Sequence, residues 1–257
     1  METAADFKRW VRSSRRSGVF RATAGQVVRA RVHDRTVFFS VINPKDTIQK
    51  CHFGGAFYEV EELGMISEHF PVGGSFLDIG ANVGNHSLYL ALFLHASLVV
   101  PVEPNPVAAE ILVSNLHLNG MESKVDFNWV GYGVSNEARS DLGVSWNARN
   151  LGGGKLIEQQ GSIPVVPAAE LVKDRSFDFI KIDVEGMEIA VLESLLPSLG
   201  QNRPVIFVEV DDKNATEFHE LIATNGYEVV DQFRRYRVNE NFLIKPSEGP
   251  AEVAKSA

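Results

Sequence analysis

The sequence predicts an α/β protein, built on a mostly parallel sheet with helices on both faces. Three observations support this fold. Strand-length apolar runs alternate with helix-length segments along most of the chain. Residues 76–79 are apolar enough for a strand buried on both faces, as in a parallel sheet. The last two predicted strands, at residues 227–230 and 241–244, are joined by a loop short enough to pair them antiparallel.

The segment before the sheet is predicted to form a hairpin and a helix. Strands at residues 26–31 and 36–41 are separated by a short polar turn. Residues 55–69 have the length and composition of a helix, and Pro71 follows. We therefore expect an N-terminal unit over residues 25–70 and the main domain over residues 71–245.

The core elements then alternate. The helix predicted at residues 106–118 begins with a proline and is stopped by Asn119 and Gly120. The remaining predictions are strands at residues 98–102, 125–130, 176–183 and 204–210, and helices at residues 86–95, 189–199 and 216–225.

A glycine turn follows the strand at residues 76–79. Gly80 and Gly84 can adopt backbone angles that other residues avoid, and without side chains they would let a ligand lie against the main chain. Asn82 adds an amide between them. The helix that follows would point its free N–H groups at the ligand, which suits a carboxylate or a phosphate.

The next strand ends in Glu103. Its two oxygens can accept both hydroxyls of a ribose, and its distance from the turn matches the spacing of a ribose-binding acid in a βαβ unit. Turn and acid together predict a site for a nucleotide-type cofactor. The alternative is a structural turn with a solvated acid at a strand end.

The residues of the glycine turn indicate which class of cofactor binds there. A dinucleotide site has a second glycine where this chain has Asn82, so the loop is better suited to a cofactor with a zwitterionic amino acid, as in S-adenosylmethionine. Two alternatives remain open. One is an NAD(P)-dependent oxidoreductase, although no Ser-Tyr-Lys or His-Asp catalytic set is visible. The other is a non-catalytic binding module with a vestigial cofactor cleft.

Five segments carry a resemblance to a known family. These are DIGANVGNHS, VEPNP, LVSNLHLNG, IKIDVEGMEIAVLESL and RPVIFVEV. Together, over roughly residues 57–210, they resemble the FkbM family of S-adenosylmethionine-dependent methyltransferases. The resemblance implies a class I, Rossmann-like fold with seven strands and a closing antiparallel hairpin. It also implies O-methylation of a hydroxyl on a sugar, glycolipid or natural product.

The family pattern carries over to specific residues. It assigns Asp78, Gly80, Asn82 and Gly84 to the methionine part of the cofactor, Glu103 to the ribose and Asn105 to the adenine rim. The pattern departs after the predicted strand at residues 125–130. There, Trp129 or Tyr132 could stack on the adenine, although core packing is the favoured role for Trp129.

Three acids are expected at the catalytic end of the sheet. Asp183, Glu185 and Glu209 lie at or just beyond the carboxyl ends of neighbouring strands, where open α/β sheets bind ligands. Asp183 is the first choice of base for the acceptor hydroxyl and Glu185 the second. His86 and His52 are less favoured bases. The alternative is an ion-pair cluster of Lys181, Asp183 and Glu209 that fixes the strand ends.

Two further segments are expected to shape the acceptor pocket. Tyr58 and Glu59, on the helix predicted before the first core strand, resemble a Tyr-Glu segment of the family and are placed near the cofactor or acceptor. Residues 146–156 are predicted to form a flexible polar loop, with residues 152–154 as a hinge, or a linker of no catalytic importance. No specific ligand spacing indicates a metal.

Charge is distributed unevenly along the 257 residues. The first 35 carry about +6, which leaves about −14 for the rest. We expect residues 1–24 to form a basic arm, with a helix that packs on the body or touches an anionic membrane, and residues 246–257 to form a disordered tail. The acidic body argues against a nucleic-acid substrate. A single cysteine and no apolar span suggest a cytoplasmic protein.

Overall fold

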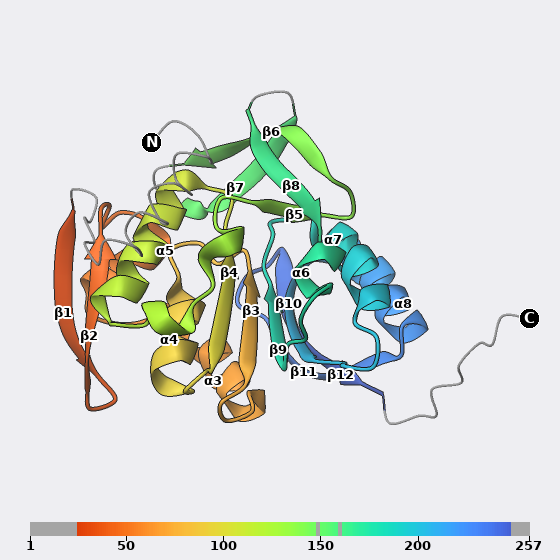
Figure 1. The fold of residues 1–257 in the computed structure, drawn as a ribbon, viewed down its shortest axis with the longest axis horizontal. Helices are drawn as coiled ribbons and strands as arrows, with labels where there is room; N and C mark the ends of the chain where they lie inside the picture. The colour runs from red at the N-terminus through yellow and green to blue at the C-terminus, as the bar shows by residue number, and fades with distance from the viewer. Residues whose placement is uncertain (1–24, 148–149, 159–160, 248–257) are drawn as a thin grey trace, which may run out of the picture.

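A computed structural model describes residues 25–147, 150–158 and 161–247. At its centre is a six-stranded sheet with the strand order β11-β12-β10-β9-β3-β4 (Figure 1). Strands β3, β4, β9 and β10 run parallel to one another, and β12 pairs antiparallel with both β10 and β11. The predicted α/β fold and closing hairpin are thereby confirmed. The strands are β3 (Ser75–Ile79), β4 (Leu98–Val102), β9 (Phe179–Ile182), β10 (Val205–Asp211), β11 (Tyr227–Phe233) and β12 (Asn239–Pro246).

Helices cover both faces of this sheet (Figure 1). Because successive strand residues point to opposite faces, Phe76 packs in one core cluster and Leu77 in the other. The first cluster lies under α4 (Asn85–Phe93) and α5 (Pro106–Leu118). The second lies under the helices α6 (Ala169–Val172), α7 (Glu188–Leu195) and α8 (Ala215–Thr224).

The N-terminal unit packs on the α4–α5 side. Strands β1 (Gln26–Val32) and β2 (Arg35–Val41) form the predicted hairpin, and two helices follow, α2 (Thr47–Phe53) and α3 (Val60–His69). The prediction of one helix over residues 55–69 was wrong at its start. Glu59 has a φ of 57°, in the left-handed region, so an α-helix cannot run through it.

The strand predicted at residues 125–130 is absent from the described part of the sheet. Only isolated bridges remain there, from Val125 to Val99 and from Val130 to Glu103. Between them the side chain of Asp126 accepts a hydrogen bond from the Asn128 N–H and starts a short 3-10 turn, η2 (Phe127–Trp129). The described sheet therefore has six strands where seven were expected.

A second sheet stands beyond the carboxyl ends of the core strands (Figure 1). Its order is β5-β8-β6-β7, from β5 (Gly133–Ser135), β6 (Arg139–Asn147), β7 (Asn150–Glu158) and β8 (Ile163–Pro167). The prediction of a flexible loop over residues 146–156 was wrong, because β6 and β7 pair antiparallel through most of it. Backbone pairing with a neighbouring strand overrides the low strand propensity of its glycines.

Two predicted segments lie outside the described residues. These are the basic arm, residues 1–24, and most of the tail predicted over residues 246–257. Within the described residues, no helix has both the length and the apolar character needed to cross a bilayer.

Candidate active site

The glycine turn after β3 is shaped by close packing. A Cβ on Gly80 would come within 1.7 Å of the Asp183 carbonyl oxygen, and one on Gly84 would press on Leu112 of α5 at 3.1 Å. Both glycines also have φ near +80°. Gly80 therefore lets β3 approach the end of β9, and Gly84 lets the start of α4 approach α5.

Glu103 braces the same turn. Its two carboxylate oxygens accept the backbone N–H groups of Asn82 and Asn105, each at 2.7 Å. Burial raises the pKa of Glu103 to about 7, even though these two hydrogen bonds act to lower it. The side chain is 6% exposed. A carboxylate has more than two acceptor positions, so Glu103 can still accept ligand hydroxyls.

Two polar atoms beside Glu103 are buried without a hydrogen-bond partner in the described structure. They are Oδ1 of Asn82 and Nδ2 of Asn105. One can accept and the other can donate, which matches the donor and acceptor capacity of a ribose hydroxyl pair. Buried polar atoms are normally paired, so this pair of orphans indicates a polar ligand.

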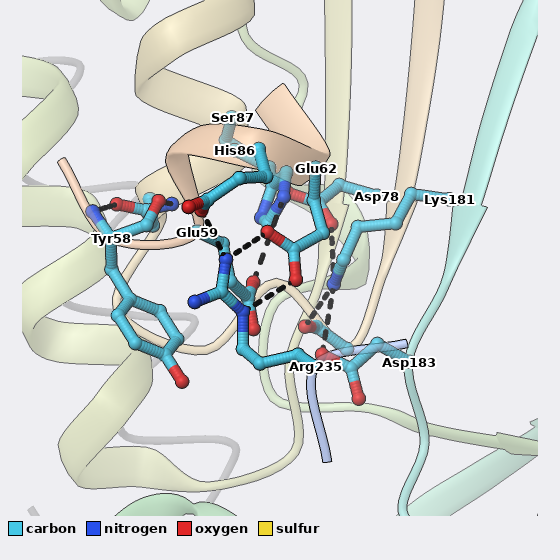
Figure 2. Close-up of polar contacts among 12 residues, drawn as sticks. Tyr58, Glu59, Glu62, Asp78, His86, Ser87, Lys181, Asp183 and Arg235 are labelled. Atoms are coloured by element: carbon cyan, nitrogen blue, oxygen red, sulfur yellow. Dashed lines mark hydrogen bonds and ion pairs between the residues drawn. The ribbon is translucent and has the colours of Figure 1, made fainter. Parts of the chain in front are cut away.

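Lys181 is the buried cation of the site. Its Nζ lies 3.4 Å from Asp78 Oδ1, 3.4 Å from Asp183 Oδ2 and 3.1 Å from the Gly80 carbonyl (Figure 2). Although burial by itself lowers its pKa, Asp183 and Asp78 raise the pKa of Lys181 above the usual range. Asp78 also accepts a hydrogen bond from Ser87 at 2.6 Å and is fully buried.

A cavity of about 390 Å³ opens beside these groups, beyond the carboxyl ends of β3, β9 and β10. The loop at residues 80–82 forms one wall. Four carboxyl groups line the cavity, and Lys181 is the single Lys or Arg in its described lining. The carboxyl groups belong to Glu59, Asp183, Glu185 and Glu209.

The carboxyl groups of this lining disturb one another. Burial, followed by repulsion from Asp183, raises the pKa of Glu59 to about 8. Burial and the same neighbour raise the pKa of Glu209 well above its usual range. Glu185 has a φ of 49°, a conformation that costs energy for a residue with a Cβ.

His86 faces the acids from the start of α4. Its Nε2 lies 3.8 Å from a Glu59 oxygen and has no hydrogen-bond partner among the described residues (Figure 2). Burial, with a smaller effect of Lys181, holds the pKa of His86 well below its usual value. The imidazole is therefore neutral at physiological pH.

The loop between β11 and β12 covers the cavity from the outside. Arg235 donates hydrogen bonds to Glu61 and Glu62 of α3, and the Tyr236 hydroxyl bonds to that of Tyr58. Tyr58 and Tyr236 both line the cavity. The N-terminal unit and the last hairpin thus contact each other beside the cavity.

A comparison with family models identifies the kind of enzyme to which this cavity belongs. A model described as Methyltransferase FkbM domain matches residues 78–236, more than half of the chain. The chain belongs to the FkbM methyltransferase family. It is therefore a methyltransferase, and its methyl donor is S-adenosyl-L-methionine. A search of curated proteins found no match.

Solved structures support the fold. The M. jannaschii tRNA m1G37 methyltransferase has a TM-score of 0.51 at 14% identity over 88% of this chain and 56% of its own. The aTrm5 structure with tRNALeu has a TM-score of 0.52 at 13% identity, over 88% of this chain and 54% of its own. Streptococcus pneumoniae Sp1610, described as a candidate tRNA (m1A22) methyltransferase, has a TM-score of 0.50 at 11% identity, over 74% of this chain and 71% of its own. This chain thus spans little more than half of the first two proteins.

The residues of this FkbM domain fit the cofactor chemically. The orphaned amide atoms of Asn82 and Asn105 flank Glu103, where a ribose would need donors and acceptors. Among the described residues no side chain caps the N-terminus of α4, so its first N–H groups suit the carboxylate of the amino-acid end. No group of acids and histidines in the described structure has metal-binding geometry.

The sequence-predicted site residues fall into two groups. Tyr58, Glu59, Gly80, Asn82, Asp183, Glu185 and Glu209 line the cavity. Glu103 and Asn105 lie behind Asn82, while Asp78 and Gly84 are buried in contacts with Lys181 and Leu112. Tyr58 and Glu59 precede α3, whereas they were expected within a helix. Trp129 and Tyr132 pack on the core and on each other.

Three contributions to the site were missed from the sequence. Asn85 holds the backbone of Tyr58, and Arg235 and Tyr236 close over the cavity. Asn85 gave no local signal. The basic and aromatic run at residues 234–237 was a signal, because such residues are unusual in a short hairpin loop.

Proposed function

We propose that this methyltransferase transfers the methyl group to a hydroxyl oxygen of a small-molecule or glycan acceptor. The observation that supports the proposal most is the carboxylate lining. A neutral hydroxyl is a poor nucleophile until its proton is accepted, and the cavity presents several carboxyl groups for that purpose next to the cofactor loop.

The protein's own residues have three tasks in this reaction. The bound cofactor supplies a methyl group that is already activated as a sulfonium. Asn82, Glu103 and Asn105, with the start of α4, hold the adenosine and amino-acid ends. Asp183, Glu185 and Glu209 face the acceptor, and the loop that carries Tyr236 excludes water.

The lining also favours a class of acceptor. Tyr58 and Tyr236 offer aromatic faces, and Asn239 offers an amide, which together suit a sugar or another compact polyhydroxylated molecule. A phosphate backbone would meet several carboxyl groups with a single lysine between them. This argues against nucleic acid, although the structural neighbours named above include tRNA methyltransferases.

Isotope transfer tests the proposal. The protein is incubated with methyl-labelled S-adenosyl-L-methionine and either cell extract or a panel of sugars, glycolipids and hydroxylated natural products. Mass spectrometry with fragmentation then locates the label. We expect a methyl ether on a hydroxyl, strongly reduced in an Asp183→Asn variant and unchanged in Glu122→Gln, an exposed control. Label on nitrogen, on carbon or in RNA would contradict the proposal.

A further inference from the structure

Glu59 occupies an unusual position for a residue of its type. It has φ 57° and ψ 50°, and it is the N-cap residue of α3 without capping that helix through its side chain. A non-glycine residue in the left-handed region stores strain, and such strain concentrates at functional sites. The hydrogen bonds between Asn85 and the neighbouring Tyr58 backbone hold it there.

The surroundings of Glu59 are short of positive charge. Asp183 and Lys181 face it from the end of β9, Glu62 from α3, Glu209 from β10 and Arg235 from the covering loop. Arg235 is already engaged by Glu61 and Glu62, and Lys181 by Asp78 and Asp183. Both cations act to lower the pKa of Glu59, but burial and the neighbouring acids outweigh them. The hydroxyl of Tyr58 and the neutral imidazole of His86 also lie near Glu59, and Glu185 and Tyr236 line the same cavity.

A second observation points from this cluster to a ligand. His86 is 4% exposed, lines the cavity, and leaves Nε2 unpartnered within the described structure. At 3.8 Å from Glu59 Oε2, this nitrogen is too far for a good hydrogen bond. A ligand oxygen in the cavity could contact both groups.

We propose that Glu59 accepts the proton of the acceptor hydroxyl, and that binding of the cationic methyl donor prepares it by driving off the proton it holds in the ligand-free protein. This inference rests on the proposed function, because only a hydroxyl acceptor needs the base. His86 is a positioning residue that orients the acceptor oxygen toward Glu59.

Two of the competing carboxyl groups, those of Asp183 and Glu209, are less suited to this role. Asp183 is already engaged in an ion pair with Lys181, whose Nζ lies 3.4 Å from Asp183 Oδ2. Burial, followed by repulsion from Asp183 and Glu59, raises the pKa of Glu209 well above its usual range. Glu59, with a pKa of about 8, lies closest to the range in which a general base works well.

The acceptor oxygen forms a bond to the methyl carbon while its proton passes to a carboxylate oxygen of Glu59. The carbon–sulfur bond breaks, and its electron pair stays on sulfur, which becomes a neutral thioether. The protonated Glu59 then returns its proton to solvent or retains it when the spent cofactor leaves.

Because the pKa of Glu59 is raised, binding of the cationic donor should be coupled to the loss of its proton. Below about pH 8, Glu59 of the ligand-free protein carries a proton. A cation in the cavity favours the ionised form, so binding should release that proton between the ordinary glutamate range and pH 8. Above pH 8 there is no proton to release. In that window, affinity for the cationic donor should rise by up to about tenfold per pH unit relative to its neutral product.

Calorimetry of the whole chain tests this directly. Titrations at pH 7 in two buffers of different ionisation enthalpy count the protons released on binding. S-adenosyl-L-homocysteine is the matched ligand, because it lacks only the methyl group and the positive charge on sulfur. We expect S-adenosyl-L-methionine to release about one proton more than the homocysteine compound. Glu59→Gln should lose this difference, whereas Glu209→Gln and the exposed control Glu122→Gln should keep it.

Each alternative result is informative. Equal proton release by the two ligands, or an unchanged difference in Glu59→Gln, would overturn the inference. If Glu59→Gln does not fold, the infrared difference spectrum of the unaltered protein with the two ligands replaces it. The spectrum for S-adenosyl-L-methionine should show a negative band where one protonated carboxyl is lost, and absence of that negative band would overturn the inference. Failure of hydroxyl methylation alone would leave the proton release intact, so the two proposals fail separately.

Discussion

Asn85 and Tyr58 are joined by two hydrogen bonds between a side-chain amide and a backbone. The Tyr58 N–H donates to Asn85 Oδ1 at 3.0 Å, and Asn85 Nδ2 donates to the Tyr58 carbonyl at 2.9 Å. The same Oδ1 lies 3.1 Å from Nε2 of the buried His52. One residue at the start of α4 therefore fixes the segment from which Tyr58 and Glu59 reach the cavity.

Replacing Asn85 should loosen that segment. Asn85→Ala leaves the N–H and carbonyl of Tyr58 unpaired in a half-buried setting, so we expect a loss of about 2–3 kcal/mol in the free energy of unfolding. Denaturant unfolding measures it. Asn136→Ala, which removes an exposed hydrogen bond to Glu193, is the matched control and should cost under about 0.5 kcal/mol. Equal losses in the two variants would argue that the hydrogen bonds between Asn85 and Tyr58 do not stabilise this segment.

Gly80 should tolerate no side chain. A Cβ there meets the Asp183 backbone oxygen at 1.7 Å, so Gly80→Ala must displace the end of β9 and should cost more than about 3 kcal/mol. Gly73 separates this clash from backbone strain, because its φ is +74° and nothing lies within 4 Å of its Cβ position. Gly73→Ala should cost only about 1–2 kcal/mol. Thermal unfolding compares the two, and similar losses would refute the packing argument.

Lys181 should be essential to the fold as well as to the site. Lys181→Met leaves Asp78 and Asp183 without their buried cation, and we expect a loss of about 3–5 kcal/mol at neutral pH. Asp78→Asn in the Lys181→Met background should restore part of the stability. Absence of any rescue would show that Asp78 is not the group left unpaired.

The fold was largely predictable where the signal is local. Apolar runs and glycine turns placed β3, α5 and the final hairpin correctly. A strand was wrongly predicted at residues 125–130 because apolar and polar residues alternate there. In the structure the Asp126 side chain starts a 3-10 helix instead. Residues 146–156 are rich in glycine and polar residues, and only pairing with a neighbouring strand reveals their conformation.

The site was predictable only in part, because several of its contacts join residues that are far apart in the sequence. Asp183 and Glu209 could be brought together because the ends of parallel strands meet at one edge of a sheet. The contact between Arg235 and Glu62 joins residues 173 positions apart, and no periodic pattern encodes it. The left-handed conformation of Glu59 depends on the fixed backbone of Tyr58, which is also a long-range effect.

Glu103, which lies behind the Asn82 wall of the cavity, is expected to bind the ribose of the cofactor. The most direct test is a cycle that combines Glu103→Ala with a derivative of S-adenosyl-L-homocysteine lacking both ribose hydroxyls, with each affinity measured by calorimetry and Glu122→Ala as the control. The unaltered protein should bind the complete ligand about 10- to 100-fold more tightly than the derivative, as expected for hydrogen bonds to a charged group. Glu103→Ala should lose that discrimination while keeping its fold. If Glu103→Ala still distinguishes the two ligands as well as the unaltered protein does, the ribose binds elsewhere and Glu103 is not its partner.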